Sequence, residues 1–118
     1  MLDFIKRGNL VMVNFGVSRE GSCQRGIRPA IVVQNDAGNK YSTTTLVIPL
    51  TSKRKNKLPV HYELKEDYDI ALSGNIAMAE QLSVISKEQI LRVGKHLSLE
   101  DIRGIDSILS VQLNLDAM

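Results

Sequence analysis

Arg28 and Thr51 are the residues whose type and setting most directly suggest chemistry. Arg28 precedes Pro29, and a residue before proline is held in an extended conformation, so the backbone beneath this guanidinium is preset. A guanidinium offers a rigid fork of N–H donors and keeps its charge, which suits a phosphate group that gains charge in a transition state. Arg28 could equally close the mouth of the fold by pairing with an acid.

Thr51 stands where an apolar run ends and a basic loop begins. Its hydroxyl can donate a hydrogen bond to a phosphate oxygen, although the local pattern also fits an ordinary threonine at a strand end. The segment "SKRKNK" over 52–57 has four basic residues in six, and taken alone it is typical of a solvated loop. Together with Arg28 and Thr51, this segment indicates one anion-binding surface.

Cys23 and His61 are the side chains that could move protons. Cys23 lies in a polar loop near Arg25 and Arg28, whose charges favour a thiolate, and it also fits a small loop residue. His61 could act as an acid or base, or be a packed or surface histidine. Neither residue shares a metal-ligand spacing with His96 or with a carboxylate, so the sequence predicts no metal and no other cofactor.

Composition and charge narrow the class of protein. The 118 residues, 43% of them hydrophobic, predict one domain over 1–118 with a single modest core. No apolar run reaches the roughly 18 residues of a membrane span, no secretory signal opens the chain, and a lone cysteine suits a reducing compartment; we therefore expect a cytoplasmic protein without a membrane partner. Residues 1–60 carry ten Lys/Arg against three Asp/Glu, whereas 61–118 carry five against ten. The basic first half suggests a surface that faces a polyanion if the fold gathers these charges on one side, and taken alone it is more typical of solvated surface charge.

Short apolar runs rich in β-branched residues dominate the chain. They predict strands at 9–15, 29–34, 43–50, 60–64, 73–79, 83–86 and 92–97. Residues 18–26 and 51–59 are expected to be loops, and "NDAGNK" at 35–40 is expected to be a turn. Pro49 lacks an N–H and therefore belongs at an edge, a bulge or the end of its strand. Ser86 and Gln89 fit a capping box, which predicts a brief helix over 86–91.

The end of the chain has a helical pattern instead. Ser98 is a suitable N-cap, and apolar residues then recur at helical spacing, which predicts a helix from about 99 to 114. Gly104 should weaken this helix by about 1 kcal/mol relative to alanine. Short strands followed by one helix predict a mainly β (α+β) fold, a small bent sheet or barrel with the helix packed on it. The wide apolar face of the helix favours a homodimer.

Several segments, taken in order, resemble the MazF/PemK-type toxin endoribonucleases of bacterial type II toxin–antitoxin systems. They are "RGNLVMVNF" (7–15), "GSCQRGIRPAIVVQND" (21–36), "LVIPLTSK" (46–53), "LPVHYEL" (58–64), "NIAMAEQLSVISKEQI" (75–90) and the terminal helix. The resemblance implies an SH3-like (CcdB/PemK-like) β-barrel, a homodimer, and an antitoxin partner with an acidic disordered tail. It also implies metal-independent, sequence-specific cleavage of single-stranded RNA, leaving 2′,3′-cyclic phosphate and 5′-hydroxyl ends.

The resemblance also assigns roles to residues. Arg28 and Thr51 fall on the family's catalytic positions, with Cys23 or His61 as possible acid or base. Positions where relatives contact RNA fall on Ser22, Cys23, Gln24, Lys53, Lys57, Leu58, Pro59 and Gln81. Many relatives have a glutamate where this chain has Cys23, and a basic residue where it has Leu82. The alternatives are a non-catalytic nucleic-acid-binding barrel and a gyrase-directed toxin of the same fold.

Overall fold

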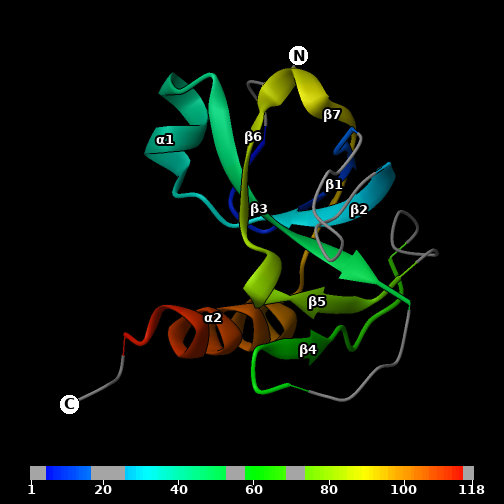
Figure 1. Ribbon diagram of the computed structural model, residues 1–118, viewed down its shortest axis with the longest axis vertical. Helices are drawn as coiled ribbons and strands as arrows, with labels where there is room; N and C mark the ends of the chain where they lie inside the picture. The colour runs from blue at the N-terminus through cyan, green and yellow to red at the C-terminus, as the bar shows by residue number, and fades with distance from the viewer. Residues whose placement is uncertain (1–4, 17–25, 53–57, 69–73, 116–118) are drawn as a thin grey trace.

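One bent antiparallel sheet makes up most of the computed structural model, which describes residues 5–16, 26–52, 58–68 and 74–115 (Figure 1). The strands follow in the spatial order β4-β5-β3-β2-β1-β7, and β6 pairs with β3 off this path. Their bounds are β1 Asn9–Asn14, β2 Ile27–Val32, β3 Thr44–Thr51, β4 His61–Glu63, β5 Ile76–Met78, β6 Ser83–Ser86 and β7 Ile90–His96. Each predicted strand is therefore confirmed to within a few residues of its expected bounds.

Two α-helices and two short 3-10 helices complete the described chain: α1 Asp36–Tyr41, η3 Ala79–Gln81, η4 Lys87–Gln89 and α2 Leu99–Leu113. The predicted terminal helix is α2, and the predicted helix at 86–91 is η4, with both hydrogen bonds of its capping box present. Neither of the described α-helices is long and apolar enough to cross a bilayer.

The turn predicted at 35–40 is wrong, because this segment forms α1. Asn35 caps the helix by accepting a hydrogen bond from the Gly38 N–H at 2.8 Å. Asn39 is buried and its Oδ1 accepts a 2.7 Å hydrogen bond from the Thr45 hydroxyl. The polar residues that resembled turn formers therefore act as a cap and as an anchor to β3.

Apolar side chains pack on both faces of the sheet. On one face α2 contributes Ile105, Ile108 and Leu109 to a cluster with Leu10, Ile31, Ile48, Leu50 and Ala77. On the other face a second cluster contains Ile5, Val11, Val13, Ala30, Val32, Val47, Ile85 and Ile90. Figure 1 shows α2 beside β4 and β5, with α1 next to the beginning of β3. The expectation of a single core is thus replaced by two clusters that share the sheet.

The mainly β fold with a packed C-terminal helix is confirmed, but hydrogen bonding does not close the described strands into a barrel, because the end strands β4 and β7 do not pair with each other. The sheet bends where β3 changes partner: its residues 44–47 pair with β6 and its residues 50–51 with β5. Pro49 was predicted at an edge, a bulge or a strand end, and it lies inside β3 next to this change of partner. The missing N–H falls where the ladder on that side is already interrupted.

Gly104 has a packing reason to interrupt α2. A Cβ atom placed on this residue would lie 2.1 Å from Cε1 of Tyr62, far inside van der Waals contact. The glycine therefore lets the Tyr62 ring of β4 lie directly on the helix backbone. The close packing of β4 on α2 therefore requires a glycine at this position, despite the predicted loss in helix propensity.

Candidate active site

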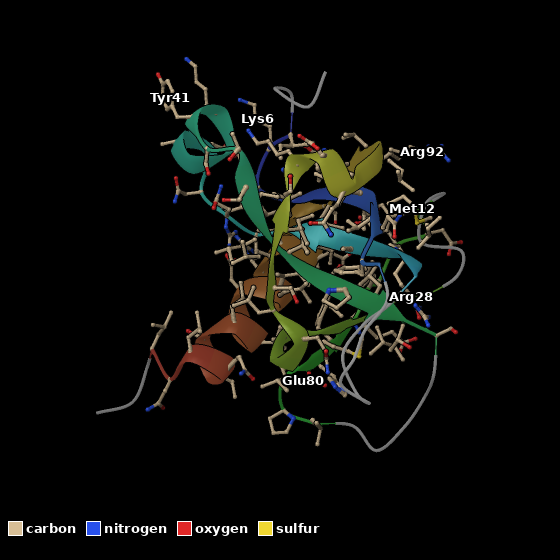
Figure 2. All side chains as sticks on the ribbon, turned by 45° about the horizontal axis from the view of Figure 1, so that its top comes forward. Lys6, Met12, Arg28, Tyr41, Glu80 and Arg92 are labelled. Atoms are coloured by element: carbon tan, nitrogen blue, oxygen red, sulfur yellow. The ribbon has the colours of Figure 1, made fainter. Side chains whose placement is uncertain are left out.

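Arg28 and Thr51 come together through the register of neighbouring strands. In the β2–β3 pair, Ala30 lies opposite Pro49, and the register is unbroken over the paired residues. Continued two residues towards the start of β2, it places Arg28 opposite Thr51. Residues opposite each other in an antiparallel pair share a face, with Cβ atoms about 5 Å apart. Figure 2 shows Arg28 at the beginning of β2, beside the end of β3.

The same row continues across two more strands. Thr51 pairs with Ile76 of β5, and Ile76 pairs with Glu63 of β4. Arg28, Thr51 and Glu63 therefore project from one face, with Ile76 between the hydroxyl and the carboxylate. Neighbouring strands lie about 4.8 Å apart, so the Cα atoms of Thr51 and Glu63 are separated by about 10 Å.

Side-chain alternation shows which face of the sheet carries this row. Ala30 lies two residues from Arg28 in β2 and belongs to the cluster on the face opposite α2. Tyr62, between His61 and Glu63, packs against the cluster on the α2 face. The Arg28–Thr51–Glu63 row therefore lies on the face of the sheet that α2 does not cover. Arg28 and Thr51 are both half-buried at the rim of this face.

The hairpin that joins β1 and β2 is closed by two glycines next to Arg28. The Phe15 N–H donates to the Gly26 carbonyl at 2.9 Å, and the Gly26 N–H donates to the Gly16 carbonyl at 2.7 Å. Both glycines have positive φ, 75° at Gly16 and 73° at Gly26, which side-chain-bearing residues rarely adopt. The hairpin loop is therefore attached at the Arg28 end of the sheet, and the predicted RNA contacts Ser22, Cys23 and Gln24 in it lie outside the described residues.

The backbone of Thr51 packs closely against Gly74. A Cβ on Gly74 would lie 2.7 Å from the carbonyl carbon of Thr51, so only glycine permits this approach of the segment that leads into β5. The predicted basic contacts Lys53 and Lys57 follow Thr51 in the chain and lie outside the described residues. The Gly74 contact fixes the backbone from which the Thr51 hydroxyl projects.

His61 forms a pair with Glu80. Its Nε2 lies 2.8 Å from Oε2 of Glu80, and the side chains are 15% and 29% exposed. The Leu58 N–H donates to Nδ1 of the same ring at 3.5 Å, so Nδ1 acts as the acceptor and Nε2–H as the donor to the carboxylate. Glu80 lies in η3, which follows the end of β5, whereas Thr51 pairs with Ile76 at the beginning of β5. The contact with Glu80 therefore holds the His61 ring away from Thr51.

The predicted residues thus fall into two groups. Arg28 and Thr51 form the first group. The second contains Leu58, Pro59, His61 and Gln81, of which Leu58 is 46% exposed, Pro59 is exposed and Gln81 is half-buried in η3. His61 lies two residues along β4 from Glu63, a step of about 7 Å, so the structure does not place it against Arg28 and Thr51.

Glu63 and Glu80 were not predicted as site residues. Glu80 directly precedes Gln81 in the E-Q pair, which was the signal available for it in the sequence. Glu63 had no local signal, because its place in the row depends on the pairing of three strands. Its Oε2 accepts a 3.4 Å hydrogen bond from the Asn75 side chain. Among the residues that the structure describes, no cluster of His, Cys, Asp and Glu could hold a metal ion.

A permanent cation, a hydroxyl and a carboxylate in one row can act on a phosphodiester. The guanidinium and the hydroxyl are donors for the non-bridging oxygens, and the carboxylate can accept a proton. Ile76 separates the donors from the acceptor, so a substrate must lie across the row to touch all three.

Comparison with known proteins identifies the family. Residues 6–113 match the model of the PemK-like, MazF-like toxins of type II toxin–antitoxin systems. The chain belongs to this family. The match covers nearly the whole chain, and it confirms the resemblance that the segments around Arg28 and Thr51 indicated.

Solved structures of this family share the fold. An endoribonuclease from a Mycobacterial species, in complex with its cognate antitoxin, matches with a TM-score of 0.78 at 19% identity over 94% of this chain and 96% of its own. MazF from Deinococcus radiodurans matches with a TM-score of 0.73 at 21% identity over 93% and 96% of the two chains. Mycobacterium tuberculosis toxin MazF-mt6 matches with a TM-score of 0.70 at 10% identity over 90% and 96%. A PemK/MazF toxin can therefore keep this sheet and helix while most of its residues change.

Proposed function

We propose that this PemK/MazF-family chain is a sequence-specific endoribonuclease that cleaves single-stranded RNA, chiefly messenger RNA, in the cytoplasm. The observation that supports the proposal is the β2–β3 register, whose continuation two residues past Ala30 and Pro49 brings Arg28 opposite Thr51 at the rim of the face that α2 leaves uncovered. The basic segment 52–57 follows Thr51 in the sequence and supplies positive charge for a polyanion.

The proposed reaction uses the RNA's own 2′-hydroxyl as the nucleophile. The 2′-oxygen forms a bond to the adjacent phosphorus, the bond from phosphorus to the 5′-oxygen breaks, and the products carry a 2′,3′-cyclic phosphate and a 5′-hydroxyl. Arg28 donates two hydrogen bonds to the non-bridging oxygens and Thr51 donates one, so both stabilise the charge that develops on the phosphorane. Because the nucleophile needs no activation by a metal, we expect the reaction to proceed in EDTA.

The reaction also requires two proton transfers. A base removes the 2′-hydroxyl proton, and an acid or a water molecule protonates the departing 5′-oxygen. An arginine side chain keeps its proton near neutral pH, so it is a poor base. We propose Glu63 as the base, because it lies in the row of Thr51, whereas His61 lies further along β4. Cys23 and His61 remain the competing candidates from the sequence.

The His61–Glu80 pair fits a second role, contact with a neighbouring nucleotide. Leu58 and Pro59 shortly precede β4 and Gln81 follows Glu80, so all are within a few residues of the pair. An amide side chain can both donate to and accept from a base edge, and the exposed Leu58 offers an apolar surface to a base. This group would select the RNA sequence, and the Arg28–Thr51 pair would cleave it.

Two protein partners complete the proposal. The net positive charge of residues 1–60 gives an acidic, disordered antitoxin tail a reason to cover the RNA face. A second copy of the chain is proposed to cover the C-terminal end of α2, where Val111, Leu113 and Leu115 are each more than half exposed. A pocket of about 380 Å³ lies beside them, lined in part by Leu46 and Leu82.

The decisive experiment incubates the purified protein with a long single-stranded RNA in excess EDTA. We expect discrete fragments with 5′-hydroxyl ends, and we expect none from the Arg28→Ala or Thr51→Ala variants. RNA that is bound with steep salt dependence but left intact would instead indicate a non-catalytic binding barrel. Intact RNA together with inhibition of DNA gyrase would indicate a gyrase-directed toxin, and either result would refute the nuclease proposal.

A further inference from the structure

Strand β4 carries two side chains of the proposed site but has little backbone support. It has three residues, His61–Glu63, and stands at one end of the strand order, paired with β5. Short edge strands are marginally stable unless another element packs against them. The contacts that β4 makes with α2 therefore determine how firmly His61 and Glu63 are held in position.

A buried carboxylate in the first turn of α2 anchors this segment. Asp101 is fully buried, and its Oδ1 accepts hydrogen bonds from the Tyr62 hydroxyl at 2.7 Å and from the Lys65 N–H at 2.9 Å. Its Oδ2 accepts from the Tyr68 hydroxyl at 2.7 Å and from the Glu66 N–H at 3.4 Å. Four donors match the acceptor capacity of one carboxylate, and all four come from residues 62–68.

The carboxylate is charged and its tyrosine partners are protonated at neutral pH. Burial alone would raise the pKa of Asp101, but the hydrogen bonds from the Lys65 N–H and the Tyr62 and Tyr68 hydroxyls outweigh it and bring the pKa below its usual value. Burial, with the bond to Asp101, raises the pKa of Tyr62 well above that of a free tyrosine. The Tyr62 hydroxyl therefore remains a donor, and the helix N-terminus further favours the negative charge.

We propose that Asp101 is a positioning residue for the active site, acting through Tyr62 to hold β4 so that Glu63 and His61 face the RNA. This inference rests on the proposed function. Tyr62 links the two layers, because its ring lies on Gly104 of α2 while its neighbours in β4 project from the opposite face. A small displacement of Tyr62 moves Glu63 relative to Thr51, and catalysis is sensitive to shifts of about 1 Å.

Tyr68 provides a matched control within the same network. Its hydroxyl makes an equally short hydrogen bond to Asp101 and also accepts one from the Ser98 N–H at 3.0 Å, but Tyr68 lies beyond β4, five residues after Glu63. Tyr62→Phe and Tyr68→Phe each delete one hydroxyl that donates to the same carboxylate. If Asp101 only stabilises the fold, Tyr68→Phe, which also loses the contact with Ser98, should lower kcat at least as much as Tyr62→Phe.

The test compares both variants with the wild-type chain in three measurements. These are thermal unfolding, kcat and KM for RNA cleavage, and the ¹H–¹⁵N spectrum of the histidine rings, which reports the tautomer of His61. The chain has two histidines, so His96 is the internal reference. Asp101→Asn is the third variant, and it keeps the shape of the side chain while removing its charge.

We expect Tyr68→Phe to lose at least as much thermal stability as Tyr62→Phe, because the Tyr68 hydroxyl also bonds Ser98. Tyr62→Phe and Asp101→Asn should lower kcat about tenfold through Glu63, raise KM through the displaced His61, and alter the His61 ring signals. Tyr68→Phe should keep kcat within about twofold of wild type. Equal kcat in the two phenylalanine variants, with unchanged His61 signals, would overturn the positioning role. If the wild-type chain does not cleave RNA, the proposed function fails, and the His61 spectrum alone still decides whether Tyr62 positions β4.

Discussion

Arg28, Thr51 and Glu63 are spread over 36 positions of the chain, and the pairing of β2, β3, β5 and β4 places them in one row. The first two could be predicted, because Arg28 precedes a proline and Thr51 ends an apolar strand in segments that resemble a known family. Glu63 could not, since its row depends on which strands are neighbours. His61 was predicted as a possible base, and its contact with Glu80 points to a separate role.

The pH dependence of cleavage distinguishes the candidate bases. We expect Glu63→Gln to lower kcat by about 100-fold or more and to remove the acidic limb of the pH–rate profile, since a glutamine cannot accept the proton. His61→Gln should chiefly raise KM, and the profile of Cys23→Ser should overlay that of wild type. The measurement is kcat and kcat/KM for one RNA between about pH 4 and 9.

Glu88→Gln is the matched control, because Glu88 is exposed on η4 and is not part of the Arg28–Thr51–Glu63 row, so this variant should behave as wild type. A Glu63→Gln variant that keeps the wild-type rate and profile would exclude Glu63 as the base. The same profile measured for His61→Gln and Cys23→Ser would then show which of the two sequence-based candidates replaces it.

At the scale of elements, α2 and β4 pack closely because Gly104 of α2 has no side chain where the Tyr62 ring of β4 lies. The sequence correctly predicts α2 from its cap and apolar spacing, and it correctly identifies Gly104 as a poor helix former. It does not indicate why a glycine is there, because the reason is the Tyr62 ring of a strand about 40 residues earlier. Residues 35–40 were wrongly predicted as a turn. They form α1, and the buried Asn39 in this helix accepts a hydrogen bond from Thr45 of β3, a contact that the local sequence does not reveal.

The effect of Gly104→Ala on the stability of the fold should change sign when the side chain of residue 62 is made small. In the wild-type background we expect Gly104→Ala to destabilise the fold by about 1–3 kcal/mol, because the new methyl group overlaps the Tyr62 ring. In a Tyr62→Ala background the same change should stabilise it by up to about 1 kcal/mol through helix propensity. Urea unfolding measures both values, and a change of the same sign in both backgrounds would contradict this packing.

At the scale of the whole molecule, one face of the sheet packs against α2 and the opposite face carries the proposed site. The face towards α2 holds the larger apolar cluster and the Asp101 network, and the opposite face carries the Arg28–Thr51–Glu63 row at its rim. Composition and the strand and helix patterns predict this mainly β fold with its terminal helix. They do not predict that β3 changes partner near Pro49, which bends the sheet and sets β5 beside Thr51 with β4 next to β5.

The central claim is that Arg28 and Thr51 act on the same phosphate. A double-mutant cycle tests it, with single-turnover cleavage rates in EDTA for wild type, Arg28→Lys, Thr51→Val and the double variant. Lysine keeps the charge but loses the fork, and valine keeps the shape but loses the hydroxyl. Thr51→Ser, which retains the hydroxyl, is the control and should keep most of the activity.

We predict that each single variant loses at least about tenfold in rate and that the double variant loses much less than the product of the two losses, because groups that stabilise one transition state together are non-additive. Losses that multiply exactly would show that the two residues act independently. Wild-type rates in either single variant would show that the residue concerned takes no part in cleavage, and either result would contradict the shared site.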